Sequence, residues 1–423
     1  MQFRKLVLLA GVAATAFAAD STSSLAASLT STTSVSIASG CSFSDTFTAT
    51  AQADLDELAS CQAIRGDISI SGELGSASIA NVKVIYGDLS ITNATDLSAF
   101  YADSLSAITG ALSMNGLTIL STLSFGSLTS VGSINWTALP ALTQTGFTKG
   151  ITDCLNIVIS DTGLESLQGL DATNVEIFNI NNNKYISTID SGLQTVSNGL
   201  IISYNAEEVE VTLDNLIWAN NITFSDVSSI SMSNLTNVNS SLGFIENQVE
   251  SLDFPTLTNV GESFSIVDND ELTETNFKNL EKVGGGFVIA NNSKLASVEN
   301  FDKLTSIGGG VILTGEFQNA TLPSLRTVRG AFDLESTEDV DCDAFDTLES
   351  KAAIGGSYAC TGSTSSSSVS SSTNTRSSSS GTSTSSGSSD STSSSSSRAA
   401  ASNFGVEAFS IFGTLAAIAL SLL

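Results

Sequence analysis

Carboxylates are the most numerous titratable side chains in this sequence, 43 in all. They gather at Asp268/Asp270/Glu271, at Glu207/Glu208/Glu210 and at Glu338/Asp339/Asp341/Asp343. Two carboxylates on one face could act as acid and base on a glycosidic bond. Charge runs at turns are mostly solvated surface, and none of these clusters completes an EF-hand loop. We therefore expect no catalytic residue, no metal and no cofactor.

Composition narrows the functional classes further. The chain has no His, which excludes imidazole-based catalysis and imidazole metal ligands. Lys and Arg number 15 against 43 Asp and Glu, for a net charge of −28. A chain without a basic patch cannot neutralise a phosphate backbone, so we expect no nucleic-acid partner.

The five cysteines predict two disulfides and one free thiol. Four paired cysteines allow three connectivities, and proximity favours Cys41–Cys61 and Cys342–Cys360. Each bridge closes a loop of about 20 residues, which contributes roughly 3 kcal/mol in the chain-entropy model. Cys154 is left over beside an apolar run, so we expect it to be a buried, unreactive thiol.

Seven Asn-x-Ser/Thr sequons are candidate N-glycosylation sites if the chain is secreted. Asn291 falls at the end of an expected strand, where a glycan would need an outward-pointing side chain. The seven residues are Asn93, Asn135, Asn221, Asn234, Asn239, Asn291 and Asn319.

The N-terminal residues predict secretion. Arg4 and Lys5 precede an apolar run of 13 residues, 6–18, which is too short to span a bilayer and ends in Ala-Phe-Ala. We therefore expect residues 1–18 to be a signal peptide, followed by a Ser/Thr-rich segment at 19–40.

The C-terminal residues predict a stalk and a glycosylphosphatidylinositol (GPI) attachment signal. Residues 361–397 contain 23 Ser and 7 Thr, a composition that cannot form a core and that indicates an O-glycosylated stalk over 361–398. Small residues and an apolar tail follow over 399–423, the pattern of a GPI signal that is removed on attachment. The candidate attachment residues are Ala399, Ala400 and Asn403.

The elements that must position these groups come from an internal repeat. Thirteen copies of a short apolar alternation, most of them led by glycine, recur at a mean spacing near 22 residues. Ile68/Ile70 and Phe287/Ile289 show the period of two that is typical of a strand with one buried face. One such strand cannot bury its face alone, but stacked turns can. We therefore predict an all-β fold, a parallel β-solenoid of about 13 turns over residues 41–360, with the two disulfides closing its ends.

Each repeat carries two further signals. A Leu-x-x-Val or Leu-x-x-Ile step, such as Leu280/Val283, precedes the strand and indicates a bend or a short second strand facing the same core. An Asn-x-x-apolar step follows several strands, at Asn183, Asn269 and Asn292. We expect these amides to be buried and to bond backbone groups of neighbouring turns.

The repeat resembles the receptor L domain, a leucine-rich-repeat-like β-solenoid. The whole layout resembles the fungal GPI-anchored cell-wall proteins of the sporulation-specific Sps2 type. This resemblance covers about residues 41–360 and both terminal signals, and it implies a role in wall assembly and integrity without a catalytic residue set. Cys154 has no place in a paired framework. The matching stretches are CSFSDTFTATAQADLDELASC, NINNNKY, DNLIWANNIT, SIVDNDEL and VGGGFVIANN.

Three functions remain open at this point: a structural or interaction protein of the wall, a glycan-binding module or adhesin, and a wall-glucan-active enzyme. We expect the first, a non-enzymatic GPI-anchored cell-surface glycoprotein needed for wall organisation and integrity, including spore-wall assembly. The expected partners are wall polysaccharide such as glucan, wall mannoproteins, and the plasma membrane through the GPI lipid.

Overall fold

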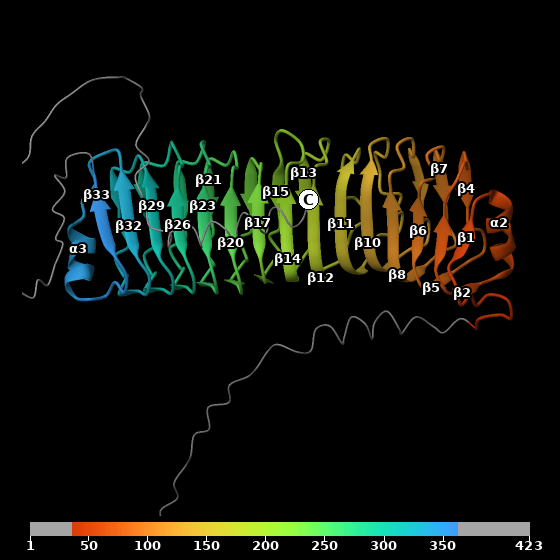
Figure 1. The fold of residues 1–423 in the computed structure, drawn as a ribbon, viewed down its shortest axis with the longest axis horizontal. Coiled ribbons are helices and arrows are strands. Elements are labelled where there is room, and N and C mark those ends of the chain that lie inside the picture. Colours follow the sequence, from red (N-terminus) through yellow and green to blue (C-terminus); the bar gives the residue numbers. More distant parts are fainter. Residues whose placement is uncertain (1–35, 363–423) are drawn as a thin grey trace, which may run out of the picture. The chain divides into compact units, whose positions relative to one another are not determined.

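The alternating segments of the sequence form one strand in every turn of a parallel β-solenoid (Figure 1). The computed structural model describes residues 36–362, and every strand pairing within them is parallel. The inward residues of a main strand are fully buried, as at Phe264 and Ile266, because alternate side chains point to opposite faces. The fold prediction is confirmed.

The main ladder has one strand more at each end than the thirteen that the sequence predicts. Its fifteen strands are connected by about 14 turns. The extra strand β1 lacks the glycine lead. The extra strand β33 follows Gly355 and Gly356, but it places Tyr358 and Cys360 where the other strands have two apolar core residues. The strands are β1 (Phe47–Ala49), β3 (Ile68–Ile70), β6 (Leu89–Thr92), β8 (Ala107–Asn115), β10 (Ser130–Leu139), β11 (Asp153–Thr162), β12 (Asn174–Asn181), β14 (Thr195–Ser203), β17 (Ile222–Ser225), β20 (Leu242–Ile245), β23 (Phe264–Val267), β26 (Phe287–Ala290), β29 (Val311–Gly315), β32 (Phe332–Ser336) and β33 (Tyr358–Thr361).

A second ladder precedes the main strand in each turn, where the Leu-x-x-Val step predicts a short strand. Leu280 and Val283 are both buried, and Val283 pairs with Val260 and Ile307 of the neighbouring turns. In the middle of the solenoid the two strands merge into long bent ones, such as β8 and β10. The separate short strands are β2 (Ala63–Arg65), β5 (Val84–Tyr86), β16 (Trp218–Ala219), β19 (Asn237–Val238), β22 (Asn259–Val260), β25 (Lys282–Val283), β28 (Ser306–Ile307) and β31 (Thr327–Val328).

A third ladder follows the main strand and was not predicted. Its strands have two or three residues. Each strand buries one of them, as β21 buries Leu252. Such a short alternation carries little periodicity in the sequence. The strands are β4 (Ser76–Ser78), β7 (Ala99–Tyr101), β9 (Thr122–Ser124), β13 (Thr188–Asp190), β15 (Glu210–Thr212), β18 (Ser229–Ser231), β21 (Ser251–Asp253), β24 (Glu274–Asn276), β27 (Ser297–Val298) and β30 (Asn319–Ala320).

Stacked phenylalanines fill the C-terminal half of the interior. Phe254, Phe277 and Phe301 stack in successive turns with ring centroids 5.2 and 5.4 Å apart. Phe264 and Phe287 form a parallel stack beside them, and Phe277 meets Phe264 edge to face at 5.0 Å. Because aromatic pairs in these geometries add to the free energy of burial, this column is expected to be the most stable part of the core.

Buried asparagines form the corner between the main strand and the third ladder. The Asn269 Oδ1 accepts hydrogen bonds from the backbone N–H and the Nδ2 of Asn247. The Asn292 Oδ1 accepts the same two hydrogen bonds from Asn269. Each Nδ2 also donates to a main-strand carbonyl, as Asn269 does to Phe244. The predicted role of these amides is confirmed.

Glycines before the main strands let adjacent turns approach closely. A Cβ at Gly308 would lie 2.0 Å from the carbonyl oxygen of Gly284, and one at Gly309 would lie 2.7 Å from the carbonyl carbon of Gly285. No side chain fits at these separations, which explains the first two glycines of each Gly-Gly-Gly step.

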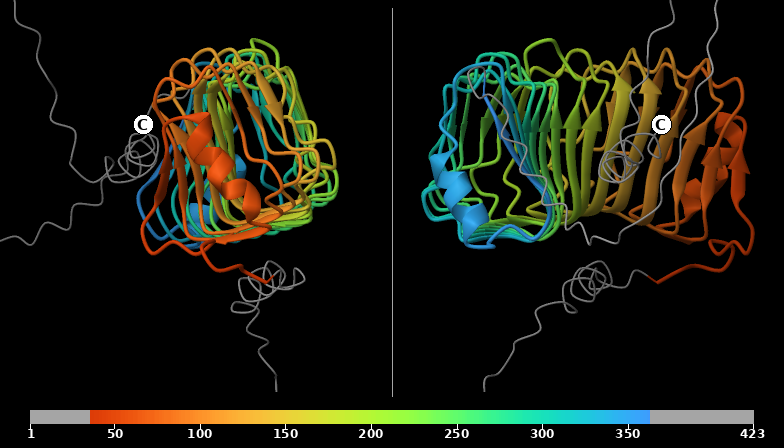
Figure 2. Two further views of the ribbon diagram at one scale, coloured as in Figure 1. Left: turned by 90° about the vertical axis from the view of Figure 1, so that its right-hand side faces the viewer. Right: turned by 60° about the vertical axis from the view of Figure 1, so that its left-hand side comes forward.

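Helices cover both ends of the solenoid (Figure 2). At the N-terminal end α2 (Gln52–Glu57) and the 3₁₀ helix η1 (Leu58–Ser60) bury Leu55 and Leu58. At the other end α3 (Asp343–Ser350) buries Phe345 against Phe332, with ring centroids 4.7 Å apart. Terminal turns have a neighbour on one side only, so such caps protect the core from solvent.

Candidate functional site

Disulfides lie beside both caps, as the predicted fold requires. Cys41 is bonded to Cys61 with a Cα–Cα distance of 5.8 Å, and Cys342 to Cys360 with 6.1 Å. Cys154 is free and buried, and its Sγ donates to the carbonyl of Asn156. Burial raises the pKa of the Cys154 thiol to about 12, so it stays protonated at neutral pH and is a poor nucleophile.

The sequon asparagines all lie on the outer side of the coil. Asn93 and Asn291 occupy equivalent corner positions with φ near +57°, and both are exposed, so the outward side chain that Asn291 needs is present. Asn234 and Asn239 are also exposed, whereas Asn135, Asn221 and Asn319 are half-buried. Glycosylation at the seven sequons stays a prediction.

Several predicted features fall outside the described residues. These are the signal peptide, most of the segment 19–40, the stalk and the attachment candidates Ala399, Ala400 and Asn403. They remain predictions. Within residues 36–362 no helix is long and apolar enough to cross a membrane.

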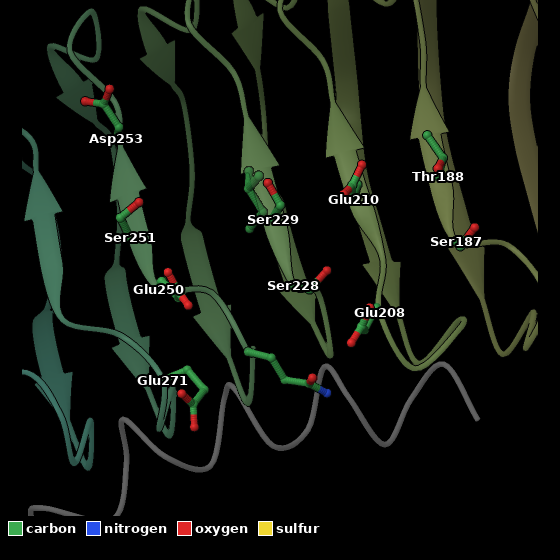
Figure 3. A pocket seen from close by; sticks show the side chains of 12 residues that line it. Ser187, Thr188, Glu208, Glu210, Ser228, Ser229, Glu250, Ser251, Asp253 and Glu271 are labelled. Carbon is green, nitrogen blue, oxygen red and sulfur yellow. The ribbon is translucent and has the colours of Figure 1, made fainter.

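A shallow acidic groove of about 680 Å³ crosses the third ladder (Figure 3). It runs from Ser187 past β15 and β18 to Glu271, so five successive turns contribute to it. Its side chains are hydroxyl groups, carboxylates and one amide, with Ile230 as the only apolar residue. The lining residues are Ser187, Thr188, Glu208, Glu210, Ser228, Ser229, Ile230, Gln248, Glu250, Ser251, Asp253 and Glu271.

The groove brings together parts of two predicted acidic clusters. Glu208 and Glu210 come from one cluster and Glu271 from another, while Glu250 and Asp253 join them from the turns between. Glu250 and Asp253 were not among the predicted residues, because the third ladder, which sets their lateral alignment, has strands too short to show a period in the sequence. The cluster from Glu338 to Asp343 lies beside the C-terminal cap, apart from this groove.

The groove carboxylates are exposed, and two of them have polar partners. Asp253 accepts a hydrogen bond from the Asn276 amide at 2.7 Å, and Glu271 forms an ion pair with Lys294. Enzymes that use a protonated carboxylic acid usually surround it with apolar residues, whereas Ile230 is the single apolar residue that lines this groove. Among residues 36–362 no group of three or more His, Cys, Asp or Glu side chains could hold a metal ion.

A second surface differs from the groove in having no charge. The outward side chains of the main ladder form a strip three residues wide. The middle row contains Thr223, Ser265 and Val288, and the last row contains Val267 and Thr314. We call this strip from β8 to β29 the main-sheet face. All of its outward residues are Ser, Thr, Asn, Gly, Ala, Val or Ile.

The comparisons with known proteins identify the family. The chain is 42% identical over 320 residues to the cell wall mannoprotein PST1 of Saccharomyces cerevisiae, covering 75% of this chain and 72% of that protein. It is 40% identical over 342 residues to the cell surface GPI-anchored protein ECM33 of Candida albicans, covering 80% and 82%. It is 33% identical over 314 residues to the sporulation-specific protein 2 of S. cerevisiae, covering 73% and 62%.

No protein-family model and no solved structure matches the chain. These relatives match 73–80% of this chain at 33–42% identity. The chain therefore belongs to the Ecm33/Pst1/Sps2 family of fungal cell wall proteins.

Proposed function

We propose that this protein is a non-enzymatic, GPI-anchored glycoprotein of the cell surface that organises the fungal cell wall and maintains its integrity, including that of the spore wall. Its relatives are named as a cell wall mannoprotein, a GPI-anchored surface protein and a sporulation-specific protein. The solenoid holds its partners, wall polysaccharide or mannoproteins, while the stalk and the anchor connect it to the plasma membrane.

The composition of the acidic groove is the observation that supports the non-enzymatic part of this proposal. The five groove carboxylates come from three turns, are exposed, and lie mainly among hydroxyl groups. A protein that binds and spaces its partners needs long, rigid faces, and a stacked solenoid presents such faces along its whole length.

Complementation of a fungal strain that lacks this gene would test the proposal. The full chain should restore resistance to a wall-binding dye and to glucanase digestion. A variant with Glu208→Gln, Glu210→Gln, Glu250→Gln and Asp253→Asn should restore it equally, because no groove carboxylate takes part in a reaction. Failure of this variant, at equal surface abundance and equal thermal stability, would support the enzyme hypothesis instead.

The anchor has its own test. A phosphatidylinositol-specific phospholipase should release the membrane-bound protein, and truncation after Ser397 should send it to the medium without restoring wall resistance. A membrane fraction unchanged by the phospholipase would contradict the GPI assignment. If the full chain itself does not restore resistance, the role in wall organisation is wrong.

A further inference from the structure

The main-sheet face is a long surface without charged side chains. Ten consecutive strands from β8 to β29 each present three outward residues, and none of these thirty is charged. Charged residues make up 14% of the chain, and 14% of thirty positions is about four. About four charged residues would therefore be expected on this face of a chain with a net charge of −28. Their absence indicates that the face binds an uncharged partner.

The boundaries of this face are acidic. Asp67 and Asp88 point outward in the first turns, and Asp333 and Glu335 do so in β32. Along the corner that follows the main strands, Asp226, Glu246 and Asp268 carry the charges. The uncharged strip is therefore a framed region rather than the edge of a generally neutral protein.

The face is flat and changes in character along its length. From β8 to β12 it presents mainly hydroxyl and amide groups, such as Ser113 and Asn179. From β14 to β29 aliphatic residues such as Ile245, Val267 and Ile312 lie among Ser, Thr and Gly. Ser265 is only 3% exposed and Val288 only 7%, because neighbouring turns press their side chains into a continuous surface.

A sugar polymer fits this combination of side chains. Pyranose rings have apolar C–H faces that pack on aliphatic side chains, and their hydroxyl groups bond to Ser, Thr and Asn. The turns repeat at about 4.8 Å, close to the length of one sugar unit in an extended chain, and ten turns span on the order of 50 Å. A polyanion would be repelled by the acidic frame, and a basic protein would be drawn to the groove instead.

Association of two copies through this face is less compatible with the sequons. Asn135 lies in the middle row of β10, and Asn221 lies at the start of β17 on the same face. A glycan at either position would hold two flat protein surfaces apart, whereas a narrow polysaccharide chain can pass beside it. The middle and last rows from β14 to β29 carry no sequon.

We infer that the main-sheet face from β14 to β29 binds a neutral β-linked wall polysaccharide, with the sugar chain lying along the solenoid axis. The inference rests on the proposed function, since it names the partner that the solenoid holds and the surface that holds it.

Sedimentation of the full mature chain with insoluble chitin and with insoluble β-1,3-glucan would test the inference and identify the polymer. We expect saturable binding to one of them that changes little between low and high salt, because no charge is involved. Ile312→Arg and Thr223→Arg, which place a long charged side chain on the flat face, should each weaken binding about tenfold, equivalent to roughly 1.4 kcal/mol.

Ser251→Arg is the matched control, since it adds the same charge at an exposed position on β21, away from this face. It should bind as the unmodified chain does, and circular dichroism should show equal thermal midpoints for all variants. Binding to neither polymer, full binding by both face variants, or a dimer that Ile312→Arg dissociates would each overturn the inference. If binding is absent but the full chain still restores wall resistance, the inference fails and the proposed function stands.

Discussion

The main-sheet face and the acidic groove lie on the same turns of the solenoid, yet they carry opposite kinds of side chain. The turns from β12 to β23 present Asn, Ser, Thr and aliphatic residues on the first surface and five carboxylates on the second. The inward residues of the strands beneath both surfaces are buried and, apart from Thr275 in β24, apolar. Stacking therefore requires buried inward residues in every turn but places no such requirement on the outward residues. The distribution of charge among the outward residues can therefore reflect function.

The largest effect should come from breaking the interior that the two surfaces share. Phe277→Ala removes a ring that contacts Phe254, Phe264 and Phe301, and it should lower the free energy of unfolding by about 3–5 kcal/mol. Hydrogen exchange should rise together in β23 and β24, which belong to the main-sheet side and the third-ladder side of one turn. Exchange that rises on one side only would show that the surfaces are stabilised separately.

The second effect concerns the C-terminal end of the solenoid, beyond both surfaces. Cys342→Ser breaks the C-terminal disulfide and should cost roughly 2–5 kcal/mol. Because solenoid turns stabilise their neighbours, exchange should rise first at 330–335 while 199–224 stays protected.

Cys154→Ser is the control for the disulfide variant, since its thiol is free and lies at the middle of the solenoid. It should cost much less. A Cys154→Ser variant as damaged as Cys342→Ser would mean that the terminal bridge contributes little beyond ordinary packing.

A smaller effect is expected at the corner that separates the two surfaces. Asn269→Val leaves the backbone N–H and the Nδ2 of Asn247 without their shared acceptor, at about 1–3 kcal/mol for a buried unpaired group. The chain contains the reciprocal control, since Val227 occupies the same corner position two turns earlier. Val227→Asn should raise the thermal midpoint, and two changes of the same sign would contradict the proposed role of the amides.

The smallest effect tests the acidic frame of the main-sheet face. The pKa of Asp333 is raised, first by its partial burial and then by Glu335. The unfolded chain therefore releases this proton at a lower pH than the folded chain, and stability falls as pH rises from about 3.8 through the higher folded pKa. Asp333→Asn should raise the thermal midpoint at pH 7 and have no effect near pH 3. A gain that persists at pH 3 would need another cause.

Most of the fold could be predicted from the sequence because stacking demands the same inward residues in every turn. The pairs Phe264/Ile266 and Phe287/Ile289 repeat clearly, and the corner amides Asn183, Asn269 and Asn292 repeat with them. The end strands β1 and β33 escaped prediction because the caps, rather than a full neighbouring turn, set their side chains.

The surfaces were harder to predict for a different physical reason. The third ladder has strands too short to show a period, so the convergence of Glu208, Glu250 and Asp253 was not visible. The main-sheet face could have been found by following positions 2, 4 and 6 of each repeat copy. Its signal is an absence of charge, which only becomes informative once the register of the turns is known.

The two caps also determine what the solenoid cannot become. A parallel coil without caps would expose unpaired N–H and C=O groups at each end, to which the terminal strand of another molecule could pair. Here α2 lies over the first turn and α3 over the last, and the disulfides hold the neighbouring chain in place (Figure 1). Copies concentrated in a wall thus cannot add end to end into open filaments, and each remains a rod of one defined length.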